Sequence, residues 1–192
     1  VTIFIDQDAS GTLNAGDEQT TTDANGTWSF TGLDYTYAGL AVYEVLPTGY
    51  VQTLGAAGYT ITGTSGTDQT NLNFANFELF DILGTKFTDT NGDGLTAGDS
   101  GLGGVTIFID KDASGTLNAG DEQTTTDANG TWSFTGLDYT YAGLAVYEVL
   151  PTGYVQTLGA AGYTITGTSG TDQTSLNFAN FELFDILGTK FT

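Results

Sequence analysis

The sequence predicts an all-β protein made of tandem β-sandwich repeats, and three observations carry this prediction. Short stretches rich in β-branched and aromatic residues alternate with turn motifs rich in Gly, Asn and Asp. No segment shows helical periodicity over a useful length. Residues 1–88 recur as residues 105–192 with only two differences, Gln7 against Lys111 and Asn71 against Ser175. The offset of 104 residues is the size of one small domain.

The repeat divides the chain into three parts. We expect a complete β-sandwich repeat at 81–184 and a partial repeat at 1–80 that lacks its first strand and first loop. The remaining residues, 185–192, are expected to form the first strand of a following repeat. We interpret the chain as a slice of a longer polymer, with an arbitrary boundary as the alternative.

Each expected strand of the complete repeat ends at a polar turn. The strands are 82–88, 105–109, 123–126, 131–134, 144–150, 163–168 and 176–183. The turn Asp127-Ala-Asn-Gly130 predicts a hairpin between two of them. The aromatic residues that we expect in the core are Trp132, Phe134, Tyr147, Phe178 and Phe181, and a carbohydrate-stacking platform is the alternative.

The composition excludes several classes of function. The chain has 23 acidic residues, three lysines and no arginine, which gives a formal net charge of −20. Nucleic-acid binding is excluded because phosphate contacts need Lys and Arg, and anionic membrane surfaces are disfavoured for the same reason. No apolar run reaches transmembrane length. Because Cys, His and Met are absent, disulfides, thiol catalysis and histidine chemistry are excluded, and an extracellular location fits.

The loop 110–121 has the spacing of a calcium-binding loop. Oxygen-bearing side chains fall at positions 1, 3, 5 and 12, a glycine occupies position 6, and the residue at position 7 offers its backbone carbonyl. The expected ligands are Asp110, Asp112, Ser114, Thr116 and Asp121, and in the earlier copy Asp6, Asp8, Ser10, Thr12 and Asp17. A cation would offset the repulsion between these carboxylates. The alternative is a solvated polar turn.

A second loop, 89–99, follows the same pattern less closely. Its closing acid lies at position 11 instead of 12. The expected ligands are Asp89, Asn91, Asp93, Leu95 at the backbone-ligand position, and Asp99. Calcium is therefore the expected cofactor of both kinds of loop.

The scarcity of basic residues makes each lysine informative. Lys86 and Lys190 are equivalent and both copies keep them, whereas Lys111 is replaced by Gln7. Glu148 falls on the apolar face of its expected strand, where a carboxylate needs a partner or a proton. The residues alone leave two hypotheses open. One is a buried Lys86–Glu148 ion pair, which is the simpler.

The second hypothesis is an amide bond formed by the protein itself. A neutral Lys86 would attack the side-chain carbonyl of Asn180 while Glu148 carries the proton and ammonia leaves, with Asn177 as the rival acceptor. The equivalent residues in the other copy are Glu44 and Asn76, with Lys190 as the matching lysine.

Together these motifs resemble a known family. The segments 84–94, 101–107, 125–134 and 147–154 resemble the B domains of serine–aspartate-repeat adhesins, and the last is similar to the Glu-x-x-Pro-x-Gly-Tyr feature of collagen-adhesin B-type domains. The resemblance covers essentially the whole repeat. It implies a prealbumin-like, immunoglobulin-like β-sandwich in tandem rods on bacterial surface proteins. It also implies calcium in the loops and a Lys–Asn or Lys–Asp isopeptide bond catalysed by a Glu. For that bond, the resemblance implies Lys86 as the lysine, Glu148 as the catalytic acid and Asn180 as the partner.

We therefore expect an extracellular structural repeat of a bacterial surface fibre, stalk or filament, and not an enzyme. Its expected partners are neighbouring repeats or other copies of itself. The strand that contains Lys190 suits completion of the next unit, either within one continuous chain or by strand donation between chains. The alternative function is an adhesin module that binds a host protein or glycan. Near-identical copies fit a spacer better than a recognition head.

Overall fold

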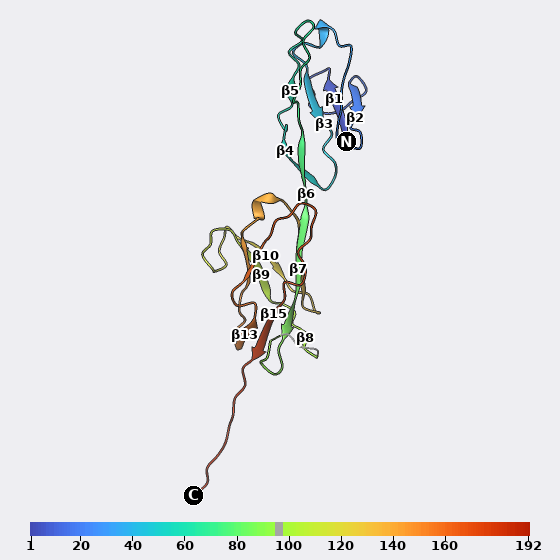
Figure 1. Cartoon of the computed structure of the whole chain (residues 1–192). Helices are drawn as coiled ribbons and strands as arrows, with labels where there is room; N and C mark the ends of the chain where they lie inside the picture. The colour runs from blue at the N-terminus through green and yellow to red at the C-terminus, as the bar shows by residue number, and fades with distance from the viewer. Residues whose placement is uncertain (95–97) are drawn as a thin grey trace. The chain divides into compact units, whose positions relative to one another are not determined.

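The computed structural model describes residues 1–94 and 98–192, and its regular structure is almost entirely β-strand (Figure 1). The chain divides into two compact units, Val1–Glu78 and Leu79–Thr192. The prediction of an all-β sandwich is confirmed. Because the two units contain nearly identical sequences, a segment that has different structures in the two units does so because its neighbours in space differ.

Unit 2 is a sandwich of two sheets. In hydrogen-bonded order, the first sheet contains β10 (Glu122–Thr125), β9 (Thr106–Asp110), β12 (Ala145–Glu148) and β14 (Tyr163–Thr164). The second contains β11 (Thr131–Leu137), β7 (Phe80–Thr88), β15 (Phe178–Glu182) and β13 (Tyr154–Leu158), with β8 (Ser100–Gly101) also paired to β7. A single turn of 3₁₀ helix, η2 (Tyr139–Tyr141), precedes β12.

Strand β7 is an inner strand of the second sheet and carries an alternating pattern. Phe80, Ile82, Gly84 and Lys86 are buried, and the residues between them are only partly buried. The strand runs antiparallel to β11 and parallel to β15. Its inward face therefore closes the core on one side, as the two-residue period of a strand requires.

The core of unit 2 lies between the two sheets. Trp132, Phe134 and Phe178 are buried there, as predicted, and the Trp132 ring lies 5.9 Å from that of Phe178. Tyr147 and Phe181, also predicted for the core, are only partly buried. Tyr147 packs instead against Phe108, with ring centroids 5.8 Å apart.

Unit 1 has the same first sheet but a reduced second one. The first sheet has the order β2 (Glu18–Thr21), β1 (Thr2–Asp6), β3 (Ala41–Glu44) and β5 (Tyr59–Thr60), and η1 (Tyr35–Tyr37) precedes β3. The second contains only β4 (Tyr50–Leu54) and β6 (Ala75–Glu78). Residues 27–33 have the sequence of β11 yet form no strand. The difference follows from pairing, because β11 exists only alongside β7.

Two sequence-based expectations need correction. The turn 127–130 does form, with the Gly130 N–H donating to the Asp127 carbonyl at 2.9 Å, but it does not close a hairpin. β10 pairs with β9 and β11 with β7, so the turn connects the two sheets. The strand expected at 163–168 is reduced to β14, and the sequence analysis missed β13. In both cases, partner strands decided the outcome rather than local pattern.

The fold predicts a marked difference between two equivalent glycines. A Cβ atom at Gly84 would lie 2.1 Å from the Leu176 carbonyl oxygen, whereas one at Gly188 would meet nothing within 4 Å. We expect Gly84→Ala to lower the free energy of unfolding of unit 2 by about 3 kcal/mol. Denaturant titration in a Trp28→Phe background, where Trp132 fluorescence reports on unit 2, measures it.

Gly188→Ala is the matched control, studied in dilute protein. It introduces the same side chain at the same sequence motif and should leave the unfolding curve unchanged. Equal effects of the two substitutions would contradict the packing described for β7.

Candidate functional site

A lysine and a glutamate meet inside unit 2. Lys86 projects inward from β7 and Glu148 from β12, so the two side chains come from opposite sheets of the sandwich. The Lys86 Nζ and Glu148 Oε2 atoms are 2.8 Å apart, and both side chains are completely inaccessible to solvent. The sequence analysis predicted this pair, and the structure brings its members together.

Asn180 lies beside this pair on the neighbouring strand. In the parallel register, Lys86 is opposite Phe178, and Asn180 is opposite Thr88. Asn180 therefore shares the inward face of the sheet with Lys86, displaced by one step of the side-chain period. Its side chain is fully buried, and neither amide atom has a hydrogen-bond partner among the residues that the structure describes. A buried amide without partners is unusual, because it loses its hydrogen bonds to water without replacement.

Asn177, the rival acceptor, has a different environment. Its side-chain oxygen accepts a hydrogen bond from the Thr85 backbone N–H at 2.9 Å. Its backbone carbonyl accepts one from the Tyr163 hydroxyl. These bonds tie Asn177 to the backbone of β7 and to β14, so its side chain has a structural role that Asn180 lacks.

The buried environment changes the ionisation of Lys86. Burial lowers the pKa of Lys86, and the hydrogen bond and charge of Glu148 oppose this shift without cancelling it. A lysine with a lowered pKa is more readily neutral, and the neutral amine is the nucleophilic form. Ionic groups removed from water are stable only with good partners, and here Lys86 has one carboxylate.

The equivalent residues of unit 1 show the arrangement without a lysine. The Asn76 Nδ2 group donates to Glu44 Oε2 at 3.2 Å, while Glu44 Oε1 and Asn76 Oδ1 are buried without hydrogen-bond partners among the described residues. Burial raises the pKa of Glu44, partly offset by the Asn76 hydrogen bond. Lys190, the predicted third member, lies exposed in the segment after β15. In unit 2, where Lys86 is present, its Nζ lies beside the Glu148 carboxylate, and the Asn180 amide has no hydrogen-bond partner among the described residues.

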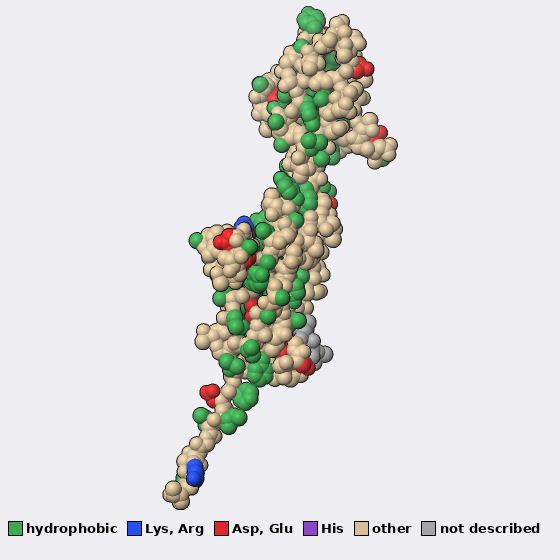
Figure 2. All heavy atoms as spheres, turned by 60° about the vertical axis from the view of Figure 1, so that its left-hand side comes forward, with side chains coloured by type: hydrophobic (Ala, Val, Ile, Leu, Met, Phe, Trp, Pro, Cys, Tyr) green, Lys and Arg blue, Asp and Glu red, His purple; other side chains and the backbone are tan. Residues whose placement is uncertain are grey.

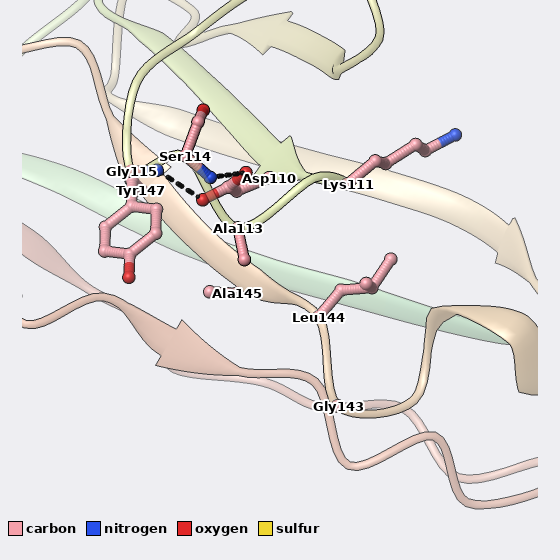
Figure 3. A pocket seen from close by; sticks show the side chains of 9 residues that line it. All are labelled: Asp110, Lys111, Ala113, Ser114, Gly115, Gly143, Leu144, Ala145 and Tyr147. Carbon is pink, nitrogen blue, oxygen red and sulfur yellow. Dashed lines mark hydrogen bonds between the residues drawn. The ribbon is translucent and has the colours of Figure 1, made fainter.

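The loop 110–121 gathers three carboxylates. Asp110, Asp112 and Asp121 each place a carboxylate oxygen within 4.8 Å of the others. Asp110 is buried, and its two oxygens accept the backbone N–H groups of Ser114 and Gly115 at 3.1 and 2.8 Å (Figure 3). The side chain of Lys111 points away from Asp110 in Figure 3 and pairs with Glu122 at 3.1 Å, outside the cluster.

Further oxygens line the same loop. The Ser114 hydroxyl donates to the Thr116 carbonyl at 2.9 Å, so both predicted oxygens lie together. Asn118, at position 9, was missed by the sequence analysis. Its Nδ2 lies 3.0 Å from Asp112 Oδ2, 3.2 Å from Ser114 Oγ and 3.5 Å from the Thr116 carbonyl. The spacing pattern offered a signal, since position 9 contributes to many such loops, often through water.

Unit 1 repeats this loop with nearly the same geometry. Asp6, Asp8 and Asp17 form the equivalent carboxylate group. Ser10 and Thr12 are bonded as their counterparts are, and Asn14 Nδ2 again lies among these oxygens. The carboxylate, hydroxyl and carbonyl groups of each loop offer oxygen ligands at a high density of negative charge, which fits a hard divalent cation.

The loop 89–99 is organised around one buried carboxylate. Asp89 is 1% exposed and accepts backbone N–H groups from Asn91, Gly92 and Gly94. The Asn91 amide donates to Asp93 at 2.8 Å. Asp99 accepts from the Thr90 N–H at 3.2 Å. Leu95 lies outside the described residues. Within the described residues these acids do not form a three-carboxylate group like that of loop 110–121.

Comparisons with known proteins give only distant similarity. No family model and no curated protein sequence matches the chain. Among solved structures, the chain is similar to a streptococcal ancillary pilin at 22% identity, with a TM-score of 0.35 over 74% of this chain and 41% of that one. The minor pilin of Streptococcus agalactiae matches at 13% identity, with a TM-score of 0.41 over 98% and 84% of the two chains. The shaft pilin of Lactobacillus rhamnosus GG matches at 15% identity, with a TM-score of 0.38 over 97% and 85%.

These similarities do not reach the level at which function is transferred from one protein to another. No helix in the described residues has the length and hydrophobicity needed to span a membrane.

Proposed function

We propose that this chain is an extracellular structural segment of a bacterial surface fibre, whose units are held by calcium and locked internally by Lys–Asn isopeptide bonds. The observation that carries the proposal is the buried cluster of Lys86, Glu148 and Asn180. Glu148 comes from the first sheet, and Lys86 and Asn180 come from the neighbouring strands β7 and β15 of the second. Near-identical tandem units suit a spacer, in which each unit performs the same mechanical task.

The cluster has the components that amide formation needs. The neutral Lys86 amine attacks the side-chain carbonyl carbon of Asn180, an N–C bond forms, and the bond from that carbon to the amide nitrogen breaks. Glu148 takes the proton from the lysine nitrogen and returns it to the departing nitrogen, which leaves as ammonia. Burial lowers the pKa of Lys86, which favours the neutral amine, and the Asn180 amide has no hydrogen-bond partner among the described residues, so it need not break one to react.

The bond would matter chiefly for mechanics. Lys86 and Asn180 are neighbours in space but belong to the first and last strands of unit 2 in sequence. An amide bond between them would therefore enclose nearly all of the unit's strands in a covalent loop. By analogy with a disulfide that closes a long loop, the bond would contribute roughly 4–5 kcal/mol of stability. A force applied along the fibre could not extend the enclosed segment.

Calcium is the cation that the acidic loops suit best. The oxygen ligands would come from Asp110, Asp112 and Asp121, from the Ser114 hydroxyl and from the Thr116 carbonyl. The Asn118 amide nitrogen donates to Asp112 Oδ2 and would hold that carboxylate in place. The buried Asp110 ends β9, so a cation there would fasten the loop to the first sheet. The equivalent loop of unit 1 would bind a second ion. Loop 89–99, with Asp89, Asn91, Asp93 and Asp99, is proposed as a weaker site.

The intact mass of the denatured, metal-free chain tests the covalent bond. We expect a mass lower than that of the encoded sequence by one ammonia, and the full mass in Lys86→Ala and in Asn180→Ala. Asn177→Ala should retain the ammonia loss, because Asn177 is bonded to the β7 backbone instead.

Lys190→Ala is the matched control, since it removes an exposed lysine of the same sequence motif. It should keep the ammonia loss of unit 2. An unshifted mass in the wild-type chain would leave Lys86 and Glu148 as a buried ion pair and refute the isopeptide proposal.

Calorimetric titration with calcium tests the cation sites. Asp112→Asn alters an exposed ligand, so the fold should survive, and we expect one fewer tight site per chain than in the wild type. Removing calcium with a chelator should lower the melting temperature, because an ion present at one hundred times its Kd contributes about 2.7 kcal/mol.

Glu122→Gln is the matched control, because it removes one negative charge, as Asp112→Asn does. Glu122 is adjacent to Asp121 in sequence but pairs with Lys111 outside the cluster, so the stoichiometry should be unchanged. Identical titrations for Asp112→Asn and the wild type, or a melting curve insensitive to chelator, would rule out structural calcium at this loop.

A further inference from the structure

Unit 1 contains a groove at the place that β7 occupies in unit 2. The groove has a volume of about 1090 Å³ and is lined by apolar side chains that include Trp28, Phe30, Leu33 and Ile61. Their counterparts in unit 2 are Trp132, Phe134, Leu137 and Ile165, all of which are buried. In unit 1 the same four side chains are only partly buried. The groove is therefore an uncovered part of the hydrophobic core.

The backbone on both sides of the groove lacks the partner seen in unit 2. Residues 27–33 form no strand, although the identical residues 131–137 form β11 against β7. On the other side, β6 belongs to a two-stranded sheet with β4, whereas its counterpart β15 lies between β13 and β7. One added strand would supply hydrogen bonds to both sides at once.

A segment with the sequence of that strand lies exposed in the same chain. Residues 183–192 are identical to residues 79–88, which contain β7, but they have no regular structure and lead away from β15 in Figure 1. Phe184 is 71% exposed, Ile186 89%, and Leu187 91%. Figure 2 shows the hydrophobic side chains standing in solvent along this terminal segment. Exposure of this much apolar surface in so short a segment is typical of a binding element.

The topology of unit 2 favours a groove in another molecule. Strands β7 and β15 are parallel, so they end at the same edge of the sandwich. The chain enters unit 2 from unit 1 at the start of β7 and leaves after β15, at the opposite edge. The ten residues 183–192 span at most about 35 Å when extended, and the inserted strand itself uses that length. No linker remains for a return to the chain's own groove.

We propose that residues 183–192 of one copy insert into the groove of unit 1 in a second copy, so that the chain assembles head to tail by strand donation. This deepens the proposed fibre role by naming the partner, a second copy of this chain. The contact would join different surfaces of the two copies, so each added copy would again offer a free groove and a free strand, as growth of a fibre requires.

The register of β7 specifies how the donated strand would lie. Phe184, Ile186 and Gly188 would face the core as Phe80, Ile82 and Gly84 do in unit 2. Lys190 would then meet Glu44 and Asn76, whose buried oxygens Oε1 and Oδ1 lack hydrogen-bond partners among the described residues. The donated lysine would place a positive charge beside this partly buried carboxylate, as Lys86 does beside Glu148 in unit 2.

Gly188 gives a sharp test because its two environments differ. In the free segment, a Cβ atom there meets nothing within 4 Å. In the inserted strand, it would take the place of the Gly84 Cβ, 2.1 Å from a backbone carbonyl. Gly188→Ala should therefore leave the single chain intact and block donation. Thr189→Ala, one residue further on, is the matched control.

Light scattering during size-exclusion chromatography of the full chain measures the assembly. We expect the wild type and Thr189→Ala to grow with concentration in steps of the 20.0 kDa chain, and Gly188→Ala to remain a monomer. A wild type that stays monomeric at all concentrations, or Gly188→Ala oligomers like those of the wild type, would overturn the proposal.

A peptide of residues 183–192 tests the groove directly, with the Gly188→Ala chain as the receiver. Insertion should bury Trp28 and shift the fluorescence emission to shorter wavelength, while the already buried Trp132 stays constant. The same peptide with Gly188→Ala should bind at least tenfold more weakly. No shift with the unaltered peptide, or equal shifts with both peptides, would overturn the proposal.

Assembly by strand pairing is independent of amide formation. Oligomers that dissociate in denaturant and oligomers that persist through an amide bond both support donation. The isopeptide proposal is tested separately, by the ammonia loss of the intact chain and its dependence on Lys86. Failure of strand donation therefore does not imply failure of the isopeptide proposal, and the reverse also holds.

Discussion

The pairing of β7 with strands on both sides is the interaction on which the rest of the structure depends. Where β7 is present, residues 131–137 form a strand, the aromatic core is buried, and Lys86 reaches Glu148. Where it is absent, the identical residues 27–33 form no strand and Trp28 remains partly exposed. One strand thus brings a sheet, a core and a buried charge into place together, as expected of cooperative β-structure, in which strands are stable only when paired.

The lysine on β7 connects the fold to the proposed function. An inward lysine in the core destabilises a domain unless its charge is matched or removed. Unit 2 matches it with Glu148, and amide formation with Asn180 would remove both the charge and the unpaired amide. Unit 1 has the complementary deficit: Glu44 is partly buried, shares one hydrogen bond with Asn76, and has no lysine beside it among the described residues. The same chemistry would therefore stabilise a unit from within and join one unit to the next strand along a fibre.

Much of this could be predicted from the sequence, and the exceptions share a physical cause. The repeat, the strands containing Lys86 and Glu148, and the carboxylate group at Asp110 follow local patterns that the sequence displays directly. The supposed hairpin at 127–130 was wrong because turn chemistry does not reveal which sheet each strand joins. The different surroundings of Asn177 and Asn180 depend on the register of β15 against β7, and the position of Asn118 depends on the three-dimensional path of its loop, neither of which a local pattern displays. Calcium and the covalent bond stay predictions.

Hydrogen–deuterium exchange of the dilute chain tests the central claim most directly, that one strand decides the state of an otherwise identical sequence. Peptides spanning residues 27–33 and 131–137 have the same sequence and mass, so they report jointly. The account predicts an isotope envelope with two components, one protected and one exchanged, which merge into the protected one as copies assemble. A single component at every concentration would contradict it, because the two copies would then have the same structure whether or not β7 is present.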